Sequence, residues 1–98
     1  MEQPRLSAPD RSRLPGAELV EKGLRDLEEG VESVEALLVS IGAPRLRELG
    51  LVVGAPFRDP ELRLYERLRL DAPDDAHSRY NALVRRLVSF ERAAERAS

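Results

Sequence analysis

Residues 17–41 read AELVEKGLRDLEEGVESVEALLVSI, and the fold depends on how this stretch is organised. Its apolar residues alternate four and three positions apart, and they are Val20, Leu24, Leu27, Val31, Val34, Leu38 and Ile41. Because an α-helix has about 3.6 residues per turn, this spacing puts all of them on one side of a helix. The alternation is typical of the seam along which two helices pack in a coiled coil. We therefore predict a long amphipathic helix over about 17–41 with another helix along its seam.

Glycine and proline residues indicate where this helix ends or breaks. Gly42 can take the left-handed conformation that closes a helix, and Pro44 cannot continue one, so we predict an end there. Gly23 and Gly30 lie inside the stretch, and each costs about 1 kcal/mol relative to alanine. One interpretation is a break near Gly30 that gives two shorter helices. The other is a continuous helix whose glycines let a partner backbone come close, and the unbroken apolar phase across Gly30 favours it.

Residues 73–97 carry a second seam with the same spacing. It consists of Tyr80, Leu83, Leu87, Phe90, Ala94 and Ala97. Three aspartates crowd the start of this stretch, where the helix dipole favours negative charge. Glu91 falls within the apolar arc, and its carboxylate must reach solvent or an arginine because unpaired burial is costly. The pattern predicts a second long helix.

The segment between the two seams is less regular. Residues 44–50 read as a short helix that starts at a proline and closes at a glycine. Residues 51–53 could form a brief strand. Residues 59–70 are ambiguous, because leucines and arginines alternate with a period of two, as in a strand. The start of this segment favours a helix, since Asp59 can cap it and Pro60 suits its first position.

Together these patterns predict an all-α fold. We expect a single domain over residues 16–98, a small bundle of two long amphipathic helices with two shorter helices between them. Residues 1–15 hold three prolines and three arginines without periodicity. They predict an N-terminal arm that is flexible or held by a partner chain, with Leu6 and Leu14 as its apolar anchors.

Composition excludes several classes of protein. The 98 residues suffice for one domain, and they include no cysteine and one histidine, which excludes a disulfide framework and a thiolate metal site. The net charge is −2. The sequence has no apolar run long enough to span a membrane and no apolar signal region, so we expect a cytoplasmic protein. Arginine almost replaces lysine and asparagine is scarce, which suggests a high-GC bacterial genome and is compatible with a thermophile.

Motifs for catalysis are missing as well. The sequence has no GxSxG, no phosphate-binding glycine loop and no HExxH, so we expect neither an enzyme nor a cofactor. Asp74 and His77 are weak metal candidates, because residues three apart on a helix can share a face. The dipole explanation for acids at a helix start is favoured over a metal site, since no second histidine joins them.

Two functional hypotheses remain. The first is a small helical interaction or scaffold protein, most simply a homodimer, or one that meets a second protein chain through its seams. The interface residues would be Val20, Leu24, Leu27, Val31, Val34, Leu38, Tyr80, Leu83, Leu87 and Phe90. The alternative is a nucleic-acid-associated module that uses an arginine face on the last helix, defined as Arg79, Arg85, Arg86, Arg92 and Arg96. A solvated face with ion pairs explains the same arginines, because glutamates are interleaved with them.

Overall fold

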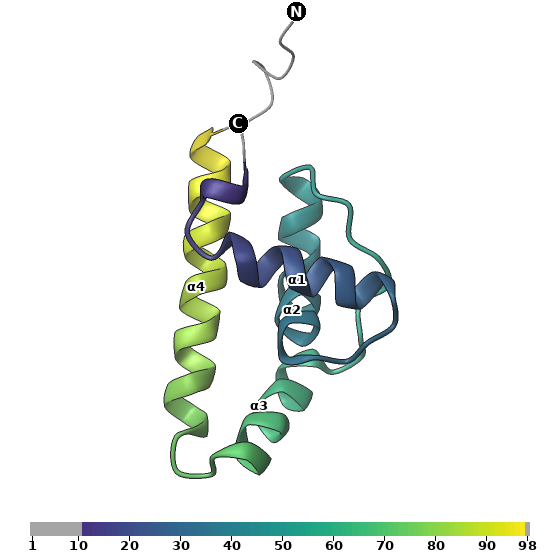
Figure 1. Ribbon diagram of the computed structural model, residues 1–98. Helices are drawn as coiled ribbons and strands as arrows, with labels where there is room; N and C mark the ends of the chain where they lie inside the picture. The colour runs from purple at the N-terminus through teal and green to yellow at the C-terminus, as the bar shows by residue number, and fades with distance from the viewer. Residues whose placement is uncertain (1–10, 98) are drawn as a thin grey trace, which may run out of the picture.

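The computed structural model describes residues 11–97, and these form an all-α structure, as the sequence predicts (Figure 1). The elements in order are η2 (Arg11–Arg13, a short 3₁₀ helix), α1 (Ala17–Glu28), α2 (Val34–Glu48), α3 (Pro60–Asp71) and α4 (Ala76–Ala97). Within residues 11–97 there is no strand, so the brief strand considered for 51–53 is wrong. Those residues belong to an irregular connector between α2 and α3.

The predicted N-terminal arm is described only in part, since residues 1–10 lie outside the described residues. Residues 11–15 lie against the chain's own helices. Leu14 packs on the hydrophobic core, and the guanidinium of Arg11 donates a hydrogen bond of 3.0 Å to the backbone carbonyl of Leu49.

The continuous helix over 17–41 is wrong, and the alternative break near Gly30 is confirmed. Gly30 has a φ of 74°, in the left-handed region. Its N–H donates to the carbonyl of Leu27, and the N–H of Val31 donates to Asp26, which is the double closure of a Schellman motif. The hydroxyl of Ser33 then accepts from the amide of Ala36 and caps the start of α2. The four-and-three spacing of the apolar residues thus continues across a turn, although the chain forms two helices there and not one.

The predicted end at Gly42 and Pro44 is also wrong, because α2 continues through both residues to Glu48. Gly42 serves as a close-packing position rather than a cap: a Cβ there would lie 2.9 Å from a carboxylate oxygen of Glu91 on α4. Pro44 removes one helical hydrogen bond. Burial of Ala43 and Leu46, both 0% exposed, offsets that loss, so tertiary packing overrides the local signal. The short helix predicted over 44–50 is therefore the last part of α2.

The other predictions for α3 and α4 are confirmed with small changes. Residues 59–70 are helical, and Pro60 stands at the first position of α3. Asp59 precedes it with a φ of 48°, but its side chain makes no capping hydrogen bond, contrary to the expected cap. The long C-terminal helix predicted over 73–97 begins at Ala76.

The two long seams do not pair along their length. In Figure 1, α1 lies across α2, while α4 runs along the other side of the molecule and forms a hairpin with α3. Accordingly, α1 packs mainly on α2, and α4 packs mainly on α3 and α2. The start of α1 reaches α4, where Glu18 forms an ion pair of 2.5 Å with Arg86.

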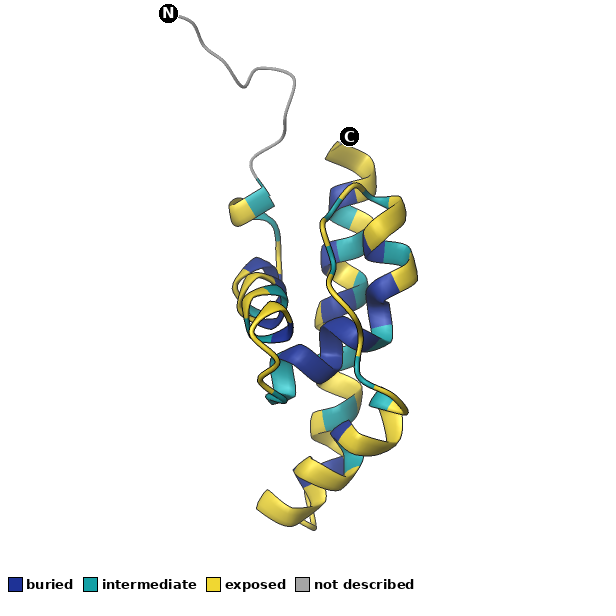
Figure 2. Ribbon diagram, turned by 90° about the vertical axis from the view of Figure 1, so that its right-hand side faces the viewer, coloured by how far each residue is buried: buried dark blue, intermediate teal, exposed yellow. Residues whose placement is uncertain are grey.

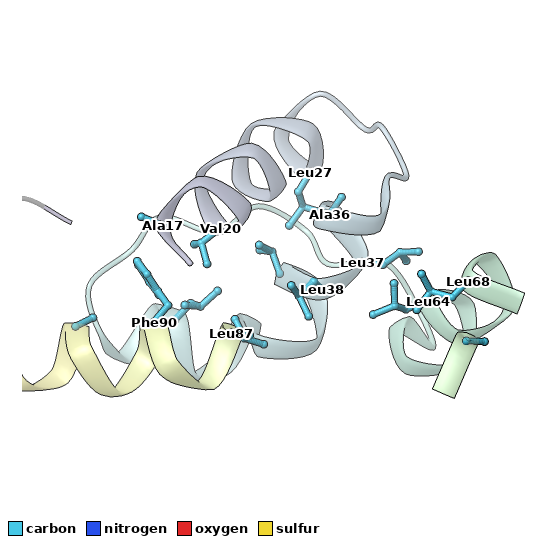
Figure 3. Packing of buried hydrophobic residues seen from close by; sticks show 14 residues of the cluster. Ala17, Val20, Leu27, Ala36, Leu37, Leu38, Leu64, Leu68, Leu87 and Phe90 are labelled. Atoms are coloured by element: carbon cyan, nitrogen blue, oxygen red, sulfur yellow. The ribbon is translucent and has the colours of Figure 1, made fainter. Parts of the chain in front are cut away.

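The hydrophobic core sits where α1, α2 and α4 meet and extends to α3 (Figure 3). Leu37, Leu38 and Phe90 are among its largest fully buried side chains. Burial is uneven. The outer end of the α3–α4 hairpin is mostly exposed in Figure 2, whereas the middle of the molecule is mostly buried.

Candidate interaction surface

The residues predicted to form an interface fall into two groups. One group is buried inside the single chain and consists of Val20, Leu27, Leu38, Leu87 and Phe90. The other keeps some exposure and consists of Leu24, Val31, Val34, Tyr80 and Leu83. The first group already has intramolecular partners in α1, α2 and α4. Only the second group can reach another chain without unfolding this one.

An open groove lies where the start of α2, the end of α3 and the first half of α4 come together. Its volume is about 950 Å³. The lining residues, which define the groove below, are Val34, Glu35, Arg67, Leu68, Leu70, Asp71, Arg79, Ala82, Leu83 and Arg86. Val34 and Leu83 belong to the predicted interface, so the structure brings one residue from each seam to this groove.

The groove combines apolar side chains with charges of both signs. Arg79 forms an ion pair of 2.9 Å with Asp71, which joins the two helices of the hairpin. Glu35 lies 3.6 Å from Lys22. Arg67 instead donates to the backbone carbonyl of Glu32, and it forms no ion pair with any carboxylate in residues 11–97. One guanidinium charge of the groove is thus held in place without a neutralising carboxylate.

Leu70 is the most exposed of the large apolar groove residues that the sequence analysis did not predict. It lines the groove, yet the residue is 82% exposed. The signal was present in the sequence: in a helix, Leu64 and Leu68 share a face, and Leu62 and Leu70 must point elsewhere. The strand-like alternation concealed this division. Because it adjoins the other apolar side chains of the groove, this leucine makes the groove a candidate interaction site.

The arginine face is only partly free. Arg79 and Arg86 are paired with Asp71 and Glu18. The backbone amide of Glu18 and then the Arg86 guanidinium lower the pKa of that carboxyl. The remaining members, Arg85, Arg92 and Arg96, are exposed, and none makes an ion pair with another residue of the described range.

The weak metal candidates do not form a ligand set. Asp74 lies in the turn before α4 and His77 in its first turn, both exposed. The imidazole Nε2 of His77 lies 3.3 Å from the side-chain amide nitrogen of Asn81. Across residues 11–97, no three side chains of the kind that bind metals are brought together.

Glu91 lies within the apolar arc of α4, and its carboxylate is accommodated between partial burial and a nearby arginine. The side chain is half-buried against α2, over Gly42. This burial raises the pKa of Glu91, and the positive charge of Arg45 opposes the rise. Arg45 makes its own ion pairs with Glu48 and Glu95, at 3.2 and 2.6 Å. The carboxylate therefore has an arginine nearby whose direct ion pairs go to other groups.

Comparison with family models, curated proteins and solved structures finds no match to this chain. None of the helices in residues 11–97 combines the length and apolar character needed to cross a membrane. The described residues thus form an all-α domain in which parts of α2, α3 and α4 surround an open groove.

Proposed function

We propose that the protein is a small non-enzymatic helical interaction protein that associates with itself through the groove. The observation that carries this proposal is the exposed side chain of Leu70 beside an apolar groove. Exposed leucines are unremarkable when scattered, but an exposed leucine next to unfilled apolar surface favours burial by another molecule. Val34 and Leu83, one from each predicted seam, add to the same surface.

The polar groups of the groove suit docking better than catalysis. Its arginines and carboxylates contact one another, the adjoining Glu18 and Lys22, or the backbone of the chain. Groups that are already paired fix the orientation of a partner, whereas a general base needs a free lone pair near its substrate.

Molar mass as a function of concentration tests this proposal. Size-exclusion chromatography with light scattering, from about 5 to 200 μM, should show a mass that rises toward twice that of one chain. Refractive index must provide the concentration, because the sequence has no tryptophan and two tyrosines. A constant monomer mass over this range would contradict self-association.

A nucleic-acid role is the second candidate, and the observation that favours it is the set of exposed guanidinium groups at Arg85, Arg92 and Arg96, which form no ion pair within residues 11–97. They follow one another along α4, and such a row can contact successive phosphates. Titration of labelled single-stranded and duplex oligonucleotides at low salt tests this role. Affinity that falls steeply as salt is added would support it, and a lack of binding would remove it.

A further inference from the structure

We infer that two copies of the chain pair about a two-fold axis, with their α3 helices antiparallel and Leu70 of each copy seated in the groove of the other. This inference rests on the proposed function and specifies its geometry. It follows from three features of the groove: its shape, its charges and the register of residues along α3.

The shape of the surface is self-complementary. A two-fold contact requires that one patch carry both a projection and a matching recess, because the same patch faces itself. Leu70 projects from the end of α3, where the residue is 82% exposed, and it borders the groove. Leu68, only 5% exposed, lies two residues before it and forms part of the groove wall. Projection and recess therefore belong to a single patch.

The charges are self-complementary too. The groove holds three arginines and two carboxylates, and Arg67 has no carboxylate partner within the described chain. A partner with only acidic side chains would leave Glu35 and Asp71 facing like charges. A second copy supplies both signs in the same arrangement, so unlike charges can meet across the axis.

The register along α3 makes the pairing specific. In two antiparallel helices related by a two-fold axis, residues equidistant from the axis face one another. An axis at the level of Arg69, which itself points to the opposite side of α3, sets Arg67 of one copy opposite Asp71 of the other. Leu70 lies three positions after Arg67, on the same side of α3 as Arg67 and Asp71, so it faces the other copy as well. One placement therefore gives Arg67 a carboxylate partner and turns the exposed leucine toward the other copy, and symmetry repeats each contact.

Three variants at exposed positions test this geometry by sedimentation equilibrium alongside the native chain. Leu70→Asp removes the projection. Ala82→Glu places a charge on the groove wall at an exposed helical position, where it can pair with Arg79 and Arg86, so the fold is kept. Leu62→Asp is the matched control, because Leu62 is 62% exposed on the same helix and does not line the groove. Circular dichroism verifies that all three remain helical.

We expect Leu70→Asp and Ala82→Glu each to weaken dimerisation by at least about tenfold, as for a buried apolar contact at the centre of an interface. Leu62→Asp should keep the native dissociation constant within about threefold. A dimer that tolerates both groove variants would overturn this geometry while leaving self-association standing. A native chain that stays monomeric would overturn both.

Discussion

The α1–α2 pair and the α3–α4 hairpin are built from similar residues, yet they bury them very differently. Helix α2 buries eight of its 15 residues, and glycine at position 23 lets α1 approach its backbone. Helix α3, with 12 residues, buries only Leu64 and Leu68 and leaves two other leucines exposed. Compactness in the first pair comes from small residues at the helix crossing. The two helices of the hairpin contain no glycine, and the exposed leucines of α3 are what make this region the candidate interface.

The largest expected effect is in the core of α2. Leu37→Ala should lower the free energy of unfolding by about 2–5 kcal/mol, because the side chain is fully buried and its removal leaves a cavity. Urea denaturation followed by circular dichroism at 222 nm measures the change. Leu62→Ala on α3 is the matched control and should change stability by no more than about 0.5 kcal/mol. Equal losses at the two leucines would break the distinction between the two regions.

Close packing between α1 and α2 is tested at Gly23. A Cβ there would overlap the Glu35 carbonyl oxygen and lie 2.5 Å from Val39 Cγ2. Gly23→Ala should therefore destabilise the chain by about 2–3 kcal/mol despite the better helix propensity of alanine. Gly54 in the connector has no atom nearer than 3.9 Å to such a Cβ, so Gly54→Ala is the control, with a change between zero and about 1 kcal/mol of stabilisation. Similar urea midpoints for the two variants would argue against the tight crossing.

A buried hydroxyl on α2 forms a hydrogen bond that holds the connector between α2 and α3 against α2. Ser40, 5% exposed, donates to the carbonyl of Ala36 at 2.8 Å and accepts from the amide of Phe57 at 3.0 Å. Ser40→Ala leaves that amide without its partner and should cost about 1–2 kcal/mol. Hydrogen exchange should then be faster at Phe57 than in the native chain. Unchanged protection of this amide would show that the hydroxyl does not hold the connector.

The smallest effect concerns Glu91, where the two regions meet. Its pKa is raised by burial in the folded chain, so over the interval from its ordinary value to the raised one the folded state binds more protons than the unfolded state. Its contribution to stability is thus favourable at acid pH and is lost as the pH rises through that interval. Glu91→Gln should raise the midpoint of thermal unfolding at neutral pH. The gain in the free energy of unfolding should be less than about 1 kcal/mol, because the group is only partly buried. The gain should vanish near pH 4, and a gain that is independent of pH would contradict the burial explanation.

The sequence was sufficient to predict the all-α class and the long C-terminal helix, because both follow from local periodicity. Over residues 59–70 the periodicity favoured a strand, and only Asp59 and Pro60 at the start favoured the helix that forms. The sequence was misleading where local signals competed with packing. Gly30 and Ser33 together mark a helix end and a helix start, but the unbroken apolar phase concealed them. Pro44 signalled an end that burial of Leu46 overrides. The groove could not be predicted, because it depends on how three helices meet in space.

One measurement tests most directly whether the open α3–α4 region is the surface through which the chain associates. Methyl NMR spectra of leucine- and valine-labelled protein, recorded over a dilution series, report each region separately. The structure predicts concentration-dependent shifts at Val34, Leu70 and Leu83, with Leu37 and Val20 unchanged. Shifts centred on the buried crossing of α1 and α2, at Val20 and Leu37, or no shifts up to millimolar concentration, would contradict it.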